Sequence, residues 1–208
     1  IAIRIARGVT GRKLIVKFEG SYHGTYDEVQ WSVGPPRDKF GAADDPNVVA
    51  DSGGLTGSDG RVSVLPYNDA AVLEAFMAAH GEGVAAVIVE PMANRMGSVV
   101  PAADFLQKAR DSCSSAGALL IFDEVIAYRL GYGGAQTVFG IKPDITTLGK
   151  SIGGGFPVGG IVGRKDIMMI TEPGRKGRVT HAGTYNGNPV TMSAGRVTQE
   201  VLTLNVHR

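Results

Sequence analysis

The sequence is poor in cysteine and has no long apolar run. Cys113 is the single cysteine among 208 residues, which excludes an internal disulfide and fits a reducing, cytoplasmic compartment. Polar residues surround it, so we expect a packed, idle thiol rather than a nucleophile. The longest apolar runs are about as long as a strand, and a membrane-spanning helix needs about 20 residues. We therefore expect no transmembrane segment.

An excess of charge of either sign is also lacking. The chain has 21 basic and 20 acidic residues, so nothing predicts binding to nucleic acid or to an anionic membrane. Internal repeats and low-complexity tracts are absent. His23 and His181 have no metal-ligand spacing to a cysteine or to a third histidine, so no metal site is predicted.

Both ends of the chain fall inside helical patterns. The chain opens at Ile1 within an apolar pattern that ends at Gly8 and Gly11, and it stops at Arg208 within a helix that begins near Pro189. We interpret residues 1–208 as the central part of one large domain from a longer protein, with residues 189–208 leading toward a further domain.

Apolar runs and helical patterns alternate along the chain. Continuous apolar runs are typical of strands that are buried on both faces, and strands that alternate with helices indicate a mostly parallel α/β sheet with helices on both faces. Residues 31–60 are rich in Gly, Pro, Asp and Ser, which predicts a long loop. The predicted strands are 13–19, 84–89, 118–122, 145–148 and 158–162, and the predicted helices are 68–80, with Asn68 as its N-cap, and 102–116.

Polar residues follow several of these strands. In parallel sheets the carboxyl ends of the strands meet at one edge, where ligands bind. We expect that edge to carry Tyr22, His23, Glu90, Asp123, Glu124 and Lys150.

Glycine is abundant, with 30 residues, roughly double the average usage. Five of them lie in residues 153–160, directly after Lys150. Most lysines are solvated surface charges, but a lysine between a strand end and closely approaching backbone can be partly desolvated and attack a carbonyl. We expect Lys150 to be such a lysine.

Asp123 ends the most apolar run. It either caps the next segment or faces a fixed cation, because an unpaired buried carboxylate is costly. A protonated ring nitrogen would be such a cation, and with Lys150 it suits pyridoxal 5'-phosphate, an aldehyde cofactor that withdraws electrons through its ring. Two other motifs fail: a P-loop at Gly149-Lys150-Ser151 needs glycine where Asp144 stands, and a dinucleotide fingerprint from Gly131 needs glycine where Gln136 stands.

The sequence resembles the class III aminotransferases over its whole length and in order. The motifs are Phe122-Asp123-Glu124-Val125, residues 144–150 (DITTLGK), residues 153–159 (GGGFPVG) and residues 181–189 (HAGTYNGNP), with Gly20-Ser21-Tyr22-His23-Gly24, Glu90-Pro91 and Asn94. Within the family it is most similar to the glutamate-1-semialdehyde aminomutase group, which includes β-amino-acid transaminases. Residues 126–130 look more like the β-phenylalanine transaminases, which favours a transaminase.

The resemblance implies a fold-type I large domain, pyridoxal phosphate as cofactor and a homodimer acting on a small amino donor and an oxo acceptor. Lys150 would bind the cofactor as an imine and shuttle a proton, and Asp123 would pair with the ring nitrogen. Other implied roles are Tyr22 and Val125 on the two ring faces, Asn94 near the phenolic oxygen, His23 as structural support, Gly183 and Thr184 at the phosphate of the neighbouring subunit's cofactor, and Arg129 and Glu90 toward substrate.

The sequence also departs from the family. Family members carry a small domain and a phosphate-binding loop before the segment that starts at Ile1, and a further small domain after the segment that ends at Arg208. If these were truly absent from the protein, weak cofactor binding and little turnover would be expected. An inactive fragment or pseudoenzyme is therefore one alternative to a transaminase. An aminomutase, which would use the same residues, is the other.

Overall fold

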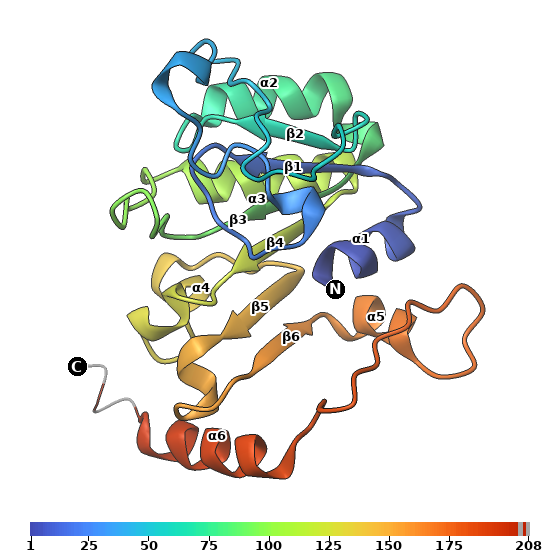
Figure 1. Cartoon of the computed structure of the whole chain (residues 1–208), viewed down its shortest axis with the longest axis vertical. Helices are drawn as coiled ribbons and strands as arrows, with labels where there is room; N and C mark the ends of the chain where they lie inside the picture. The colour runs from blue at the N-terminus through green and yellow to red at the C-terminus, as the bar shows by residue number, and fades with distance from the viewer. Residues whose placement is uncertain (204–205, 207–208) are drawn as a thin grey trace.

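A computed structural model describes residues 1–203 and 206 of the chain. One six-stranded sheet runs through the molecule in the order β2-β1-β3-β4-β5-β6 (Figure 1). Neighbouring strands from β2 to β5 are parallel, and β6 runs antiparallel to β5. The strands are β1 (Leu14–Phe18), β2 (Val62–Leu65), β3 (Val84–Val89), β4 (Leu119–Asp123), β5 (Ile145–Gly149) and β6 (Gly159–Gly163). The mostly parallel sheet predicted from the alternating pattern is confirmed.

Helices cover both faces of this sheet. Side chains of α2 and α3 pack on one face, and those of α1 and α5 pack on the other. Helix α6 lies beyond β6, against the turn that follows β5. The helices are α1 (Ala2–Thr10), α2 (Ala70–His80), α3 (Phe105–Ala116), α4 (Ala135–Phe139), α5 (Lys165–Met168) and α6 (Pro189–Val201).

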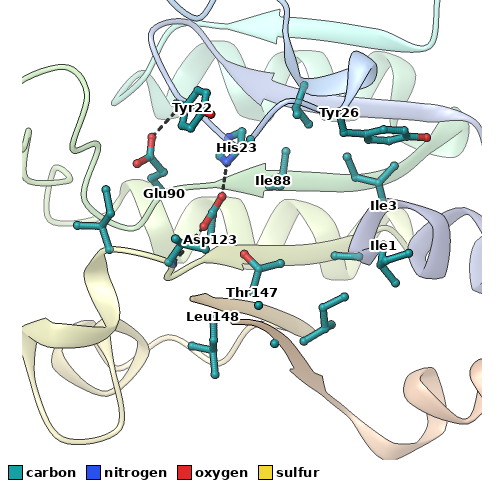
Figure 2. A pocket seen from close by; sticks show the side chains of 18 of the residues that line it. Ile1, Ile3, Tyr22, His23, Tyr26, Ile88, Glu90, Asp123, Thr147 and Leu148 are labelled. Carbon is teal, nitrogen blue, oxygen red and sulfur yellow. Dashed lines mark hydrogen bonds and ion pairs between the residues drawn. The ribbon is translucent and has the colours of Figure 1, made fainter. Parts of the chain in front are cut away.

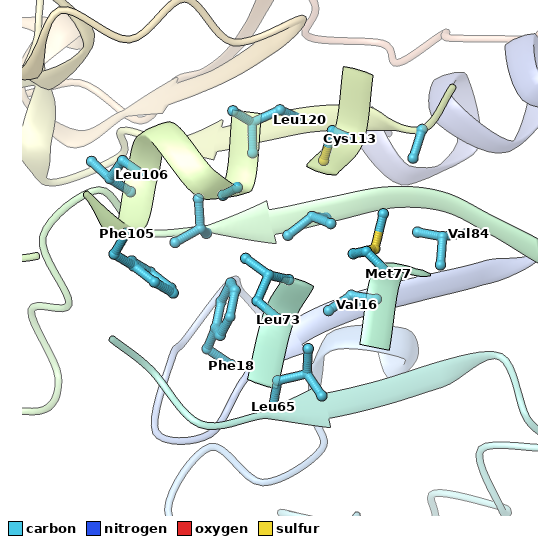
Figure 3. Packing of buried hydrophobic residues seen from close by; sticks show 14 of the residues in the cluster. Val16, Phe18, Leu65, Leu73, Met77, Val84, Phe105, Leu106, Cys113 and Leu120 are labelled. Carbon is cyan, nitrogen blue, oxygen red and sulfur yellow. The ribbon is translucent and has the colours of Figure 1, made fainter. Parts of the chain in front are cut away.

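Strand β3 shows why the core forms on both sides. All six of its residues are buried, and alternate side chains point to opposite faces of a strand. Val84, which Figure 3 labels, joins the cluster beneath α2 and α3, as do Val87 and Val89. Ala86 and Ile88 join the cluster beneath α1. The continuous apolar run at 84–89 is therefore a strand buried on both faces, as predicted.

Cys113 belongs to the cluster beneath α3 and is fully buried. Burial raises the pKa of its thiol to about 12. A thiol that stays protonated is a poor nucleophile, which confirms the prediction of a packed, idle cysteine.

The predicted N-cap of α2 is wrong by one residue. Asp69 is the N-cap, and its side chain accepts a hydrogen bond from the Val72 amide at 3.0 Å. Asn68 has a positive φ of 67° and instead binds the segment before α3, through Val100 and Ala102. Helix α3 also begins later than predicted, at Phe105 rather than Ala102.

Strand β2 was missed by the sequence pattern. It is only four residues long and lies at the edge of the sheet, paired with β1 alone. Trp31 packs on its Val62 and Val64. Residues 31–60 contain short 3-10 and bridge structure rather than regular helices or strands. Within the described part of the chain, no helix is long and apolar enough to cross a membrane.

Candidate active site

The carboxyl ends of β1, β3, β4 and β5 meet around a cavity of about 490 Å³. This is within the size range of small-molecule sites. Figure 2 shows side chains from these strand ends pointing toward one another. Six of the predicted site residues line the cavity: Tyr22, His23, Glu90, Asp123, Val125 and Lys150.

Asp123, the last residue of β4, is 8% exposed. His23 Nδ1 lies 2.8 Å from Asp123 Oδ2, and the Val125 amide donates to Asp123 Oδ1 at 3.2 Å. Burial by itself would raise the pKa of Asp123, but the hydrogen bond and charge of His23, together with the Val125 amide, lower that pKa below its usual value. The structure therefore keeps a buried carboxylate ionised at the cavity.

His23 has a closer role than the sequence predicted. Its side chain is 1% exposed, and it contacts the carboxylate itself rather than merely supporting Tyr22. In the described part of the chain, its second nitrogen, Nε2, is buried without a hydrogen-bond partner. The two residues are 100 positions apart, so no local pattern could have indicated the contact.

Glu90 holds the loop that carries the aromatic residue. Its carboxylate is 5% exposed and accepts a hydrogen bond from the Tyr22 amide at 3.1 Å. Burial raises the pKa of Glu90, and the charge of Asp123 raises it further. Arg95 lies over the Tyr22 ring, with its guanidinium carbon 5.7 Å from the ring centroid. The observed contact of Glu90 is thus with backbone.

Lys150 follows β5 directly and lines the cavity, but it is exposed. The expectation that this residue is partly desolvated is therefore wrong for the described chain. Its φ of 46° is in the left-handed region, which is uncommon for a residue with a side chain. Such backbone outliers cluster at functional sites.

The glycines after Lys150 have a structural reason of their own. A Cβ on Gly195 of α6 would lie 2.6 Å from the Ile152 carbonyl oxygen, and one on Gly153 would lie 2.7 Å from Val158. Gly154 has a φ of 60°, a conformation that glycine adopts without strain. Gly195 and Gly154, whose Cβ would lie 2.8 Å from the Ala194 carbonyl oxygen, let the turn after β5 pack closely on α6, whereas Gly153 makes room for Val158.

Four predicted residues lie away from the cavity lining. The Asn94 side chain donates to Ser98 Oγ at 3.1 Å, and Arg129 lines a second cavity of about 520 Å³ with Tyr132 and Ser151. Gly183 and Thr184 are exposed in the loop before α6.

The start of α6 is capped by a side chain of the chain itself. The Asn188 side chain accepts hydrogen bonds from the Val190 and Thr191 amides. These first amides of the helix are therefore satisfied by the protein itself.

Several lining residues were not singled out from the sequence: Tyr26, Thr147 and His181, with Ile1 and Ile3 of the first helix. His181 opens the motif at 181–189 and Thr147 lies in the motif at 144–150, so these motifs were the available signal for the two residues. Tyr26 lies in none of the quoted motifs. Among the residues that the structure describes, no group of three His, Cys, Asp or Glu side chains is placed to hold a metal ion.

Residues 1–205 match the family described as aminotransferase class-III. The chain belongs to this family. It is 52% identical over 201 residues to the glutamate-1-semialdehyde 2,1-aminomutase of Thermomicrobium roseum, covering 96% of this chain and 45% of that protein.

Solved structures of transaminases share the fold. An omega-transaminase from Sphaerobacter thermophilus superposes with a TM-score of 0.90 at 41% identity, covering 98% of this chain and 47% of that one. A structure described as a transaminase with PLP bound gives a TM-score of 0.86 at 34% identity, covering 99% of this chain and 47% of that one. The chain thus spans less than half the length of the relatives that it matches.

Pyridoxal phosphate is bound in one of these solved transaminase structures, and the residues at the cavity fit it. A buried, ionised Asp123 suits a protonated ring nitrogen, and Lys150 presents a primary amine to the same cavity. The cavity of about 490 Å³ is large enough for a small ring with its substituents.

Proposed function

We propose that the protein is a pyridoxal-phosphate-dependent aminotransferase that moves an amino group from an amino acid or amine to an oxo acid or aldehyde. The observation that carries the proposal is the shared cavity of the Asp123 carboxylate and the Lys150 amine. When bound, the cofactor supplies an electron-withdrawing ring that weakens bonds at the substrate carbon beside the amino nitrogen.

Each residue at the cavity has one role in the proposed reaction. Asp123 keeps a proton on the ring nitrogen, because its lowered pKa leaves it ionised opposite that cation. Tyr22 and Val125 border the cavity from two different strand ends and fix the orientation of the ring. Lys150 is the base that accepts the proton of the substrate carbon and returns it to the cofactor carbon, since its amine lines the same cavity as Asp123.

A second copy of the chain completes the site in this proposal. Gly183 and Thr184 are exposed and lie outside the cavity of their own subunit, which supports a role at the phosphate group in a neighbouring subunit. Mixing Lys150→Ala and Thr184→Ala subunits tests this: activity above that of either variant alone is expected, because one site of the mixed dimer is intact. Activity no higher than that of the separate variants would refute the shared site.

The amino group moves between two molecules in this proposal, rather than within one as in an aminomutase. The short segment at 126–130 supports the transaminase, and Arg129 within it remains the proposed contact for a substrate carboxylate. Exchange of ¹⁵N between a separate donor and acceptor is the expected result. Isomerisation of a single substrate without such exchange would establish the aminomutase.

The deciding experiment traps the cofactor on the protein. Pyridoxal phosphate is added to wild type, Lys150→Ala and the matched surface control Lys142→Ala, and sodium borohydride then reduces any imine. We expect a visible absorbance band and a stable adduct on Lys150 in wild type and in the control, and neither in Lys150→Ala. Absence of both from wild type would leave an inactive fragment or pseudoenzyme as the better reading.

We also propose a cytoplasmic location, which one residue supports. Cys113 is the single cysteine and is buried as a thiol, which supports the reducing environment of the cytoplasm.

A further inference from the structure

Lys17 is a buried charged residue that the proposed reaction does not use. It is the fourth residue of β1 and has no exposed surface. Its neighbours Val16 and Phe18 join the cluster beneath α2 and α3, whereas Ile15 joins the cluster on the other face. By strand alternation Lys17 points to the face of Ile15, which is the face that residues 20–51 cover.

The Lys17 amine donates a hydrogen bond to the backbone carbonyl of Trp31. That carbonyl lies at the centre of the covering loop. Next to it, the Ser32 carbonyl accepts from the Gly20 amide at 2.8 Å, and the Ser32 amide donates to the Val49 carbonyl at 2.6 Å. The hydrogen bond from the amine therefore holds the backbone of Trp31 and Ser32 against the sheet. This backbone connects the two halves of the loop through hydrogen bonds.

Acidic groups from three segments face this amine. Asp51 of the loop, Glu90 after β3 and Glu19 after β1 each attract its charge. Burial outweighs this attraction and lowers the pKa of Lys17 to about 7. The amine thus changes its charge near neutral pH while it stays bound to the Trp31 carbonyl.

Two site residues, Tyr22 and His23, lie in the chain between Lys17 and Trp31, the two residues that this hydrogen bond joins. Tyr22 bonds Glu90 through its amide, and His23 bonds Asp123 through its ring. We propose that Lys17 is a positioning residue for the active site: through the Trp31 carbonyl it holds residues 20–51 on the sheet, so that Tyr22 and His23 stay in place at the cavity. The effect on catalysis rests on the proposed function, whereas the role of Lys17 in holding residues 20–51 on the sheet does not.

The first test is hydrogen exchange in Lys17→Met, which keeps an apolar stem and removes the amine. Lys13→Met, at an exposed position just before the same strand, is the matched control. We expect amides of residues 20–51 to exchange at least tenfold faster in Lys17→Met, with β3 and β4 unchanged and the control like wild type. Unchanged exchange in residues 20–51 would overturn the proposal.

The pH dependence gives a readout that a merely space-filling residue would not move. The closed loop lowers the pKa of the amine, so the open loop binds more protons between about pH 7 and 10.5. Protection of residues 20–51 should rise up to about tenfold from pH 7.5 to 8.5 and stay flat from pH 5.5 to 6.5, after correction for intrinsic rates. Lys17→Met should show no rise.

If Lys17→Met fails to fold, a titration of the wild-type protein tests the proposal instead. With ¹³C-labelled lysine, the Lys17 side chain should titrate near pH 7, and amides of residues 20–34 should shift with the same midpoint. A Lys17 midpoint that these amides do not share would overturn the proposal.

A cofactor measurement separates this inference from the proposed function. Lys17→Met should weaken pyridoxal phosphate binding at least fivefold, whereas Lys13→Met should leave it unchanged. If wild type binds no cofactor, the proposed function fails. The hydrogen-exchange results then still test whether Lys17 holds residues 20–51 on the sheet. Equal cofactor affinity in Lys17→Met and wild type would remove Lys17 from the positioning of the site.

Discussion

At the scale of single residues, an imidazole helps to keep the central carboxylate ionised. Burial raises the pKa of Asp123, whereas the hydrogen bond and charge of His23, together with hydrogen bonds from Val125 and Thr147, lower that pKa below its usual value. A buried hydrogen bond to a charged group is worth about 1.5–3 kcal/mol. His23 is thus part of the chemistry at Asp123, although it comes from another strand end.

Replacing His23 by leucine should expose this contribution. We expect His23→Leu to lower the free energy of unfolding by about 1.5–3 kcal/mol at pH 7, as measured by urea unfolding. The lowered pKa of Asp123 means that its stabilisation is present above pH 3.8 and is lost as the pH falls through the folded-state pKa. The difference between variant and wild type should therefore narrow below pH 3.8.

His80→Leu is the matched control, because His80 is an exposed residue at the end of α2. It should change the free energy of unfolding by no more than about 0.5 kcal/mol. A His23→Leu protein as stable as this control would show that the His23 contact contributes nothing to folding.

The sequence located Asp123 and Lys150 but not their surroundings. A carboxylate directly after a continuous apolar run marks a strand end, and that is a local signal. The contact with His23 depends on β1 and β4 flanking β3 in the sheet, which no local pattern encodes.

At the scale of elements, short and capped segments were the hardest to predict. Asn68 and Asp69 are both good N-cap residues, so composition alone did not choose between them. The positive φ of Asn68 turns its side chain toward the segment before α3. Strand β2 was too short for its alternation to be recognised, and its partner β1 lies more than 40 residues earlier in the chain.

Asp144 joins four elements at one buried carboxylate. It is 3% exposed and accepts from Arg110 of α3 at 2.7 Å, from Arg164 after β6 at 2.8 Å and from the Leu120 amide of β4 at 2.8 Å. Its place just before β5 makes it the point where the edge of the sheet is tied to α3.

Asp144→Asn should lower the free energy of unfolding by about 3 kcal/mol, because it removes the negative charge between two guanidinium groups. Thermal and urea unfolding would measure the loss. The matched control is Asp166→Asn, since Asp166 is an exposed partner of Arg164 and exposed pairs contribute about 0–1 kcal/mol. Equal losses in the two variants would contradict a special role for Asp144.

At the scale of the whole molecule, fold class was predictable and strand order was not. Three apolar runs that end in polar residues were enough to indicate a parallel sheet with a site at one edge. The order β2-β1-β3-β4-β5-β6 follows from how connections cross the sheet, which single-sequence periodicity does not contain. The placing of Arg129 at a second cavity was missed for the same reason.

Cofactor binding should stabilise the whole fold in a way that identifies the role of Lys150. A ligand at 100 times its dissociation constant stabilises a protein by about 2.7 kcal/mol. In the proposed function, pyridoxal phosphate would bind Lys150 covalently, whereas pyridoxamine phosphate has an amine in place of the aldehyde and would make only non-covalent contacts. In thermal unfolding, we therefore expect Lys150→Ala to lose most of the stabilisation by pyridoxal phosphate and to keep that by pyridoxamine phosphate. Asp123→Asn should weaken both, since each ligand carries the ring nitrogen that Asp123 would face. Equal stabilisation of wild type and Lys150→Ala by pyridoxal phosphate would contradict a covalent bond between this cofactor and Lys150.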